Sequence, residues 1–197
     1  MGVEYELKFR ADAAQQDRLR QEIAGEETVL SMETTYYDTP GGAMSARRYT
    51  LRRRMENERS VCTLKTPAQG QGRQEYELDC PDIRCAIPEL CKQSGLLELE
   101  SILAEGVVPV CGARFTRVAK TVILSDCVVE LALDRGVLTG AGNEIPLCEV
   151  EIELKQGSKE GAYAYALALA AGYGLQPEPL SKFRRAQLLA EGKGDRL

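Results

Sequence analysis

The first ten residues alternate between charged and apolar side chains, and this pattern constrains the fold more than any other feature of the chain. The charged residues are Glu4, Glu6, Lys8 and Arg10. The apolar residues that alternate with them are Val3, Tyr5, Leu7 and Phe9. Because successive side chains of a β-strand point to opposite faces, a period of two predicts a strand. Residues 3–10 are therefore expected to form a strand with one charged face and one apolar face.

Further segments of strand-like pattern follow, separated by turns rich in glycine and proline. Strands are expected over residues 34–38, 49–55, 60–65, 74–80, 115–124, 128–134 and 147–155, with clear turns at 38–42 and 66–70. This makes about eight strands, and they lack the rhythm of βαβ units. The pattern predicts an antiparallel sheet or barrel decorated by helices.

Four helices are expected between and after the strands. Their ranges are 11–25, 87–105, 158–171 and 181–191. The expected N-caps are Asp12, Ser158 and Ser181, the expected stops are Gly25, Gly172 and Gly192, and Pro88 is expected near the first turn of the second helix. No internal repeat or long linker divides the chain, so residues 1–197 are expected to form one α+β domain.

The charged faces of these strands hold acids and bases in separate places. Acids concentrate in the first and last expected strands, which carry Glu4, Glu6, Glu149, Glu151 and Glu153. Cations concentrate in the middle strands, which carry Arg52, Arg54, Lys65 and Arg117. The chain has 17 Arg and only 8 Lys. Arginine is favoured where phosphate or carboxylate is recognised by a planar, bidentate donor.

Two interpretations of these faces remain open at this point. A charged strand face is ordinarily the solvated side of a half-buried sheet, where each cross-strand pair contributes about 0.2–1 kcal/mol. Alternatively, the sheet closes with this face inward and forms a pore lined by acids and bases. Such a pore is costly without partners for its charges, and a polyanionic ligand with a divalent metal would satisfy both signs. The segregation of signs and the excess of arginine favour the pore.

Composition removes several classes of function. The chain has no histidine, which excludes Ser-His-Asp and Cys-His catalysis and zinc sites with histidine ligands. A net charge of −5 argues against a nucleic-acid-binding surface, and no row of aromatic residues that could stack on bases accompanies the arginines of residues 47–54. We expect no membrane segment and no secretory signal. With seven cysteines and no C-x-x-C pair, the thiols are expected to be reduced, as in a cytoplasmic protein.

Nine short motifs, in order along almost the whole chain, resemble those of the CYTH domain proteins, the triphosphate tunnel metalloenzymes. They are Glu4-Tyr5-Glu6-Leu7-Lys8, Tyr36-Tyr37-Asp38-Thr39-Pro40, Leu51-Arg52-Arg53-Arg54, Thr63-Leu64-Lys65, Arg73-Gln74-Glu75-Tyr76-Glu77, Phe115-Thr116-Arg117, Glu130-Leu131-Ala132-Leu133-Asp134-Arg135-Gly136, Glu149-Val150-Glu151-Ile152-Glu153-Leu154-Lys155 and Ser181-Lys182-Phe183-Arg184-Arg185. The resemblance implies an eight-stranded antiparallel β-barrel tunnel with flanking helices, which binds triphosphate-containing substrates together with Mg²⁺ or Mn²⁺.

The resemblance also implies roles for residues. The implied metal ligands are Glu4, Glu6, Glu151 and Glu153. The implied phosphate-binding residues are Lys8, Arg52, Arg54, Lys65, Arg117, Lys182 and Arg185. Glu75 and Glu77 would orient these cations or a metal-bound water, as would Glu149 and Asp134 less directly. The residues expected to matter most for catalysis are Glu4, Glu6, Lys8, Lys65, Glu75 and Lys182.

Within the family, the motifs are most similar to those of bacterial inorganic triphosphatases, here as a stand-alone CYTH domain. This predicts hydrolysis of inorganic tripolyphosphate to pyrophosphate and orthophosphate. The alternatives are a thiamine triphosphatase or nucleoside triphosphatase, a class IV adenylate cyclase, whose His-Phe pair is missing here, and a non-catalytic polyphosphate-binding module. The sequence departs from its relatives at Arg185-Ala186-Gln187, where Arg-Gly-Tyr is usual. It leaves the assembly state open, a homodimer included.

Overall fold

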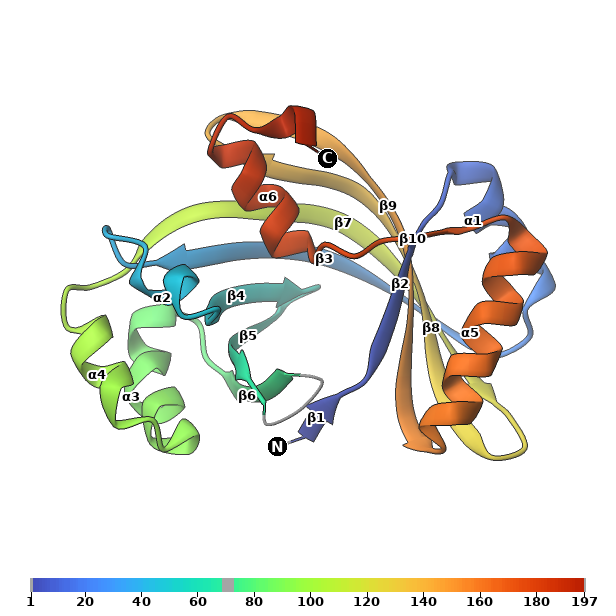
Figure 1. Ribbon diagram of the computed structural model, residues 1–197, viewed down its shortest axis with the longest axis horizontal. Coiled ribbons are helices and arrows are strands. Elements are labelled where there is room, and N and C mark those ends of the chain that lie inside the picture. The colour runs from blue at the N-terminus through green and yellow to red at the C-terminus, as the bar shows by residue number, and fades with distance from the viewer. Residues whose placement is uncertain (1, 69–72, 197) are drawn as a thin grey trace.

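An antiparallel sheet curls around a central space and carries helices at both ends and over its middle (Figure 1). The computed structural model describes residues 2–68 and 73–196, and the side chains of 5–68 and 73–195. The ten strands of this part are β1 Gly2–Glu4, β2 Glu6–Arg10, β3 Glu26–Asp38, β4 Thr50–Glu56, β5 Arg59–Pro67, β6 Arg73–Asp79, β7 Val108–Ile123, β8 Cys127–Gly140, β9 Asn143–Gly157 and β10 Gln176–Pro177. The helices are α1 Ala13–Glu22, α2 Ala43–Ala46, α3 Ile83–Ser94, α4 Leu97–Leu103, α5 Lys159–Tyr173 and α6 Lys182–Ala190, followed by a 3₁₀ turn at Gly194–Arg196.

The N-terminal strand is divided between the two edges of the sheet. In the order β1-β6-β5-β4-β3-β7-β8-β9-β2-β10, β1 pairs with β6, whereas β2 pairs with β9. Tyr5 joins β1 to β2, and its carbonyl accepts a hydrogen bond from the backbone N–H of Leu154 at 2.9 Å. Among the described residues, no hydrogen-bonded strand pair closes the ring. The expected eight-stranded barrel is therefore a curled antiparallel sheet whose edges are joined by the chain at Tyr5.

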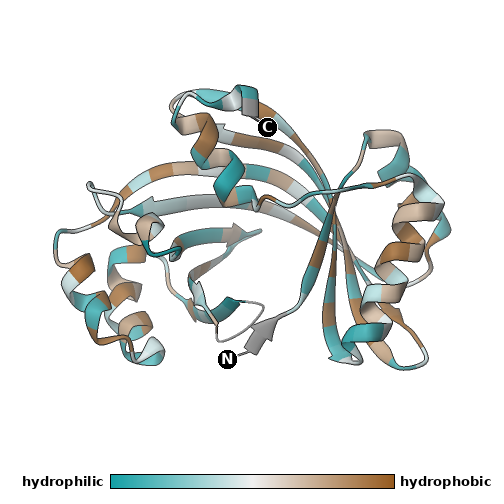
Figure 2. Cartoon of the chain, in the orientation of Figure 1, coloured by the Kyte–Doolittle hydropathy of each residue, from teal (hydrophilic) through white to brown (hydrophobic). Residues whose placement is uncertain are grey.

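Two apolar clusters attach helices to the outside of the sheet. Hydrophilic and hydrophobic residues alternate along several strands (Figure 2), and a period of two places the two sets on opposite faces of the sheet. Leu19 of α1 packs with Val129 and Ile152 of β8 and β9, in a cluster that α5 also joins. At the other end, α3 and α4 pack on β4, β5 and β6 through residues such as Leu64 and Leu90. The charged side chains at the alternate positions, such as Arg52 of β4 and Glu151 of β9, consequently face the inside.

Helix α6 packs on the inner face. Ala186 lies in a cluster with Leu138 of β8 and Leu147 of β9. Because Leu138 is four residues from Asp134 on the same strand, both side chains lie on the same face of the sheet. A Cβ at Gly140 would come within 2.7 Å of the Ala186 carbonyl oxygen, so a larger residue there would push the helix away. The helix therefore covers part of the inside of the sheet.

The structure confirms all three expected N-caps, Asp12, Ser158 and Ser181. Asp12 caps α1 by accepting the backbone N–H of Gln15 at 2.7 Å, and the Gln15 side chain accepts the N–H of Asp12 in return. Ser181 caps α6 by accepting the N–H of Arg184 at 3.1 Å. Helix α5 starts after Ser158 as expected, but it continues to Tyr173, because Gly174 rather than Gly172 adopts the left-handed conformation that ends it.

The expected helix over 87–105 is wrong, because it is two helices. Gly95 has a φ of 65° and ends α3, after which Leu96 precedes α4. Pro88 lies within α3, which begins at Ile83. The expected stop at Gly25 also differs, since α1 ends at Glu22 with Ile23 as its C-cap. Of the turn expected at 66–70, Thr66 and Pro67 are instead the last residues of β5, and residues 69–70 lie outside the described part.

Helix length gives one further observation. Within residues 2–68 and 73–196, no helix combines the length and the apolar character that a membrane crossing requires.

Candidate active site

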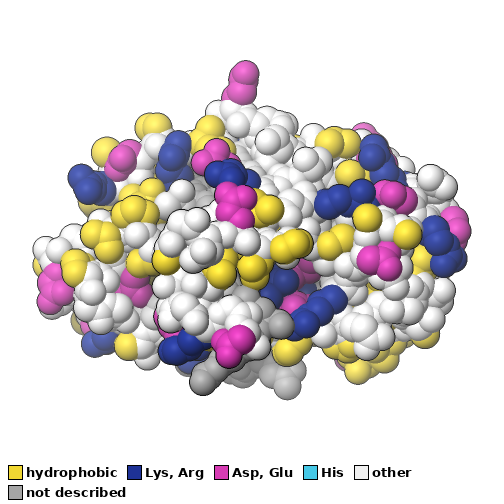
Figure 3. Space-filling model, turned by 90° about the horizontal axis from the view of Figure 1, so that it is seen from above, with side chains coloured by type: hydrophobic (Ala, Val, Ile, Leu, Met, Phe, Trp, Pro, Cys, Tyr) yellow, Lys and Arg dark blue, Asp and Glu magenta, His cyan; other side chains and the backbone are white. Residues whose placement is uncertain are grey.

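A cavity of about 370 Å³ lies inside the curled sheet, bounded by strands β2 to β9 and the start of α6. The charged residues that line it are Glu6, Lys8, Arg52, Arg54, Glu56, Lys65, Arg73, Glu75, Glu77, Arg117, Glu130, Glu151, Glu153, Lys155 and Lys182. On the outer face seen in Figure 3, acidic and basic side chains are interspersed. Inside the cavity, cations predominate on β4 and β5 and acids on β2, β8 and β9 taken together, although several of these strands also carry one residue of the opposite sign. The charged faces therefore point inward, as the pore interpretation requires.

Strands β4 and β5 form a basic wall. Lys65 on β5 and Arg52 on β4 both contact one carboxylate oxygen of Glu75, Oε1, at 3.2 Å. Glu75 therefore holds these two cations at a fixed separation. Arg54, two residues from Arg52 on the same face, contacts Glu56.

The electrostatics of Arg54 favour an anion in the cavity. Burial and the neighbouring Arg52 lower the pKa of Arg54 below its ordinary value, despite the contact with Glu56. Its buried Nε atom makes no hydrogen bond among the described residues. Phosphate oxygens would supply both the missing acceptor and the opposing charge.

Strands β2, β8 and β9 form an acidic wall. In the strand register, Glu153 lies directly opposite Glu6 on β2 and Glu130 on β8. Like charges directly opposite one another are destabilising, so this row favours a cation between or beside its members. Two ammonium groups are already close: Lys155 lies 2.8 Å from Glu153, and Lys8 lies 3.4 Å from Glu6.

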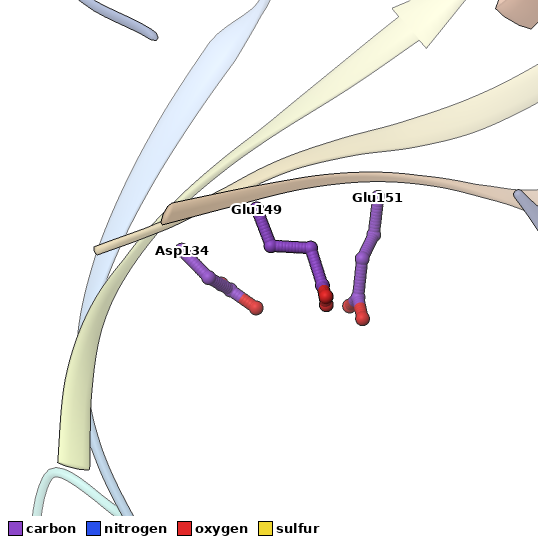
Figure 4. Close-up of side chains that lie close together, drawn as sticks. All are labelled: Asp134, Glu149 and Glu151. Atoms are coloured by element: carbon purple, nitrogen blue, oxygen red, sulfur yellow. The ribbon is translucent and has the colours of Figure 1, made fainter. Parts of the chain in front are cut away.

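A third group of charges lies deeper, where α6 meets the sheet. Asp134, Glu149 and Glu151 turn their carboxylates toward one another (Figure 4), and one oxygen from each lies within 4.8 Å of the others. The Lys182 ammonium contacts all three, at 2.8 Å from Asp134 and 2.6 Å from Glu151. Arg117 donates two hydrogen bonds of 2.7 Å to Asp134 and a third to Glu151.

The contacts of this deep group keep Glu151 and Lys182 ionised, whereas burial raises the pKa of Glu149 to about 8. Burial alone would raise the pKa of Glu151, but Lys182 and Arg117 outweigh it and hold that pKa well below its usual value. Burial would lower the pKa of Lys182, yet Asp134, Glu151 and Glu149 raise it above its ordinary value. Each buried charge is thus stabilised by its partners rather than by water.

Comparison with known proteins identifies the family of the chain that forms this cavity. The sequence profile of the CYTH domain matches residues 2–186, almost the whole chain. The chain belongs to the CYTH domain family. The inorganic triphosphatase of Haemophilus influenzae is 28% identical over 164 residues, which are 81% of this chain and 46% of that protein. The chain thus spans about half the length of this curated relative.

Solved structures share the CYTH fold with this chain. HpAC1 of Hippeastrum, for which a dominant triphosphatase activity is described, has a TM-score of 0.65 at 20% identity and covers 97% of both chains. The PH1819 protein of Pyrococcus horikoshii has a TM-score of 0.64 at 22% identity, covering 96% of this chain and 99% of its own. At these identities the similarity concerns the fold.

The structure brings most of the expected CYTH site residues to the cavity. Those that line it are Glu6, Lys8, Arg52, Arg54, Lys65, Glu75, Glu77, Arg117, Glu151, Glu153 and Lys182. Glu4 lies in β1, but its side chain is outside the described part. Arg185 is not among the described residues that line the cavity. Its guanidinium instead contacts Glu149 and, at 3.5 Å, Glu178.

Four charged cavity residues were not expected as site residues. These are Glu56, Arg73, Glu130 and Lys155. The alternation of their strands carries a signal for each, because each is two or four residues from an expected site residue or motif position on the same face. Glu178 had no such signal, because it follows the two-residue strand β10 and its surroundings are created by tertiary contacts alone.

Proposed function

We propose that this CYTH domain hydrolyses inorganic tripolyphosphate to pyrophosphate and orthophosphate with the help of Mg²⁺ or Mn²⁺. The observation that carries this proposal is the cavity, in which a basic wall faces an acidic wall across a single space of about 370 Å³. A triphosphate needs cations along its length, and a divalent ion shared with carboxylates would join it to the acidic side. The 28% identity with an inorganic triphosphatase supports the choice of substrate.

The acidic wall fits Mg²⁺ or Mn²⁺ by its donor atoms. Both ions prefer carboxylate oxygens, and Glu6 and Glu153 lie opposite each other in the register, with Glu151 on the same face of β9. Glu4 would extend this set, since it is two residues before Glu6. When bound, the ion would shield the phosphate oxygens and lower the pKa of the attacking water.

The basic wall would bind the phosphate chain. Arg52, Arg54 and Lys65 present donors from neighbouring strands, and they would stabilise charge on the equatorial oxygens of a loose transition state. Glu75 would fix the directions of Arg52 and Lys65, both of which it contacts. Such positioning lowers the barrier because these donors need little reorganisation during the reaction.

The remaining cations would hold the substrate from the other sides of the cavity. Lys8 projects from β2, Arg117 from β7 and Lys182 from the first residue of α6. None of these groups needs to become a covalent nucleophile, since the attack is by water. The chemistry therefore agrees with a chain that has no histidine.

A substrate and metal panel tests the proposal. Purified protein would be incubated with tripolyphosphate, thiamine triphosphate or ATP, each with Mg²⁺ or Mn²⁺, and the products resolved by ion chromatography. The expected result is orthophosphate and pyrophosphate from tripolyphosphate at a higher kcat/KM than from the organic substrates. Preferred cleavage of thiamine triphosphate or ATP would transfer the assignment to those substrates, and formation of cyclic AMP would identify a cyclase.

Matched variants connect this activity to the cavity. Glu6→Gln keeps the size of a cavity residue and removes one metal-binding charge, so it should abolish turnover while the circular dichroism spectrum is unchanged. Glu144→Gln removes a carboxylate that pairs with Arg114 on the exposed side of the sheet, and it should leave turnover unchanged. Binding of tripolyphosphate without turnover by the wild-type protein would indicate a polyphosphate-binding module instead.

A further inference from the structure

Two buried carboxylates lie behind the cavity, outside the groups that the proposed function uses. The side chains of Glu149 and Glu178 have no exposed surface, and neither residue is among the described residues that line the cavity. Arg185 lies between them and contacts both. A buried carboxylate is costly unless it is paired, so these contacts with Arg185 offset part of the cost of burying the two residues.

Glu178 joins the start of α6 to the strand that carries Glu6 and Lys8. One of its carboxylate oxygens accepts the backbone N–H of Leu180 at 2.9 Å, and the other accepts Nε of Arg10 at 2.6 Å. Its own backbone N–H donates to the carbonyl of Lys8 at 2.9 Å. One residue therefore fixes the entry to the helix relative to β2.

Glu149 extends this connection into the cavity. It contacts the Lys182 ammonium on one side and the Arg185 guanidinium on the other. The groups Arg10, Glu178, Arg185, Glu149 and Lys182 thus form an uninterrupted series of alternating charges from the half-exposed Arg10 to the cavity. Each member contacts at least one oppositely charged neighbour in the series.

The same contacts weigh against Glu149 as a metal ligand. Although its carboxylate is close to those of Asp134 and Glu151, the Lys182 ammonium already contacts all three. Arg117 and Arg185 contribute two more positive charges to this group. Three carboxylates are matched by three cations of the chain itself, and of these carboxylates only Glu151 is among the described residues that line the cavity. This leaves Glu149 to act on Lys182.

We propose that Glu149 and Glu178 are positioning residues that hold Lys182 at the cavity, Glu149 by direct contact and Glu178 through Arg185 and the start of α6. Neither would touch the substrate. The inference rests on the proposed function in one respect only: the proposed function assigns Lys182 the role of binding a phosphate of the substrate. Arg185, expected from the sequence to bind phosphate, would serve instead to keep Glu149 and Glu178 aligned through its contacts with both.

A double-mutant cycle tests whether the two carboxylates act through Lys182. Glu149→Gln and Glu178→Gln keep the side-chain size, and each should lower kcat/KM for tripolyphosphate by about tenfold or more in the wild-type background. In a Lys182→Met background, the same substitutions should change kcat/KM by less than about twofold. A full effect in both backgrounds would overturn the proposal, since it would show action independent of Lys182. Glu144→Gln is the matched control.

Chemical labelling of lysines gives a second result that needs no turnover. Reductive methylation followed by mass spectrometry would compare Lys182 with Lys120, a buried lysine held by backbone carbonyls of Arg20 and Ile23, and with the exposed Lys159. In Glu149→Gln and Glu178→Gln, methylation of Lys182 should rise severalfold while Lys120 stays protected.

Two labelling outcomes would contradict the proposal. One is protection of Lys182 in both variants, which would show that neither carboxylate holds it. The other is equal labelling of Lys120 and Lys182, which would show that the variants loosen the whole fold. If the wild-type protein fails to cleave tripolyphosphate, the proposed function fails, while the labelling result still decides how Lys182 is held.

Discussion

Replacing Arg117 with methionine should destabilise the fold more than removal of a surface arginine. The substitution keeps an unbranched aliphatic stem but removes the guanidinium that donates two hydrogen bonds of 2.7 Å to Asp134 and a third to Glu151. The Asp134 side chain has no exposed surface, so water does not replace these donors. Removing one partner of a buried ion pair costs about 3–5 kcal/mol. We expect about 3 kcal/mol, because Lys182 still contacts both carboxylates.

Thermal unfolding followed by circular dichroism measures this effect. For a chain of this size, each kcal/mol shifts Tm by about 2–4 °C, so Arg117→Met should melt about 6–12 °C below the wild-type protein. Arg114→Met is the control, since Arg114 pairs with Glu144 on the exposed side and should give no measurable shift. Tm values for the two variants within about 2 °C of each other would refute the reasoning. Adding Asp134→Asn to Arg117→Met should recover part of the loss, because it removes the unpaired charge.

Three further predictions concern the basic wall, the thiols and the metal. Glu75→Gln should raise KM for tripolyphosphate about tenfold with little change in Tm, because Arg52 and Lys65 lose the carboxylate that aligns them. Steady-state kinetics would measure this, and an unchanged KM would remove Glu75 from the site. Burial raises the pKa of Cys111 to about 12, whereas Cys85 is exposed. Iodoacetamide at pH 8 should therefore modify Cys85 and leave Cys111 intact until urea is added. Modification of Cys111 before urea is added, detected by mass spectrometry, would contradict its burial. Chelation with EDTA should stop phosphate release and added Mg²⁺ or Mn²⁺ should restore it, so that activity surviving exhaustive chelation would argue against a metal-dependent reaction.

The side chains that face the cavity could be predicted where the alternation is strict. Glu6 and Lys8 line the cavity because period two in residues 3–10 places them on one face, and Arg52 and Arg54 do so for the same reason. The sequence could not decide whether that face is solvated or enclosed. Enclosure depends on the meeting of β1 with β6 and of β2 with β9, which are contacts between distant parts of the chain.

Strand lengths were less predictable, because glycine and proline occur inside strands as well as in turns. Strand β7 begins at Val108 rather than at residue 115, although Pro109 and Gly112 resemble turn residues. A Cβ at Gly112 would lie 2.7 Å from the carbonyl oxygen of Thr34 on the neighbouring strand. This glycine therefore serves close strand packing rather than a turn, a distinction that a single sequence does not contain.

The charges behind the cavity were the least predictable part of the site. Arg185 occurs in a motif that implies phosphate binding, yet in the structure its contacts are with Glu149 and Glu178. Both motif spacing and strand periodicity report which face a residue occupies. They do not report which other buried charge reaches it, and that information decides whether an arginine is available to a ligand.

The division of the first strand between two edges has a consequence for how the chain folds. Residues 2–10 are synthesised before the strands they pair with, and β2 pairs with β9, which lies most of the sheet's sequence away. Contacts of such high sequence separation make folding slow, since the entropy of closing a long loop must be overcome before the pairing stabilises it. Until β9 and β10 have formed, β2 lacks its partners, and its edges resemble the exposed edges through which sheets aggregate. Ring assembly should therefore be a late event in folding, and strand exchange between newly made chains its most natural error.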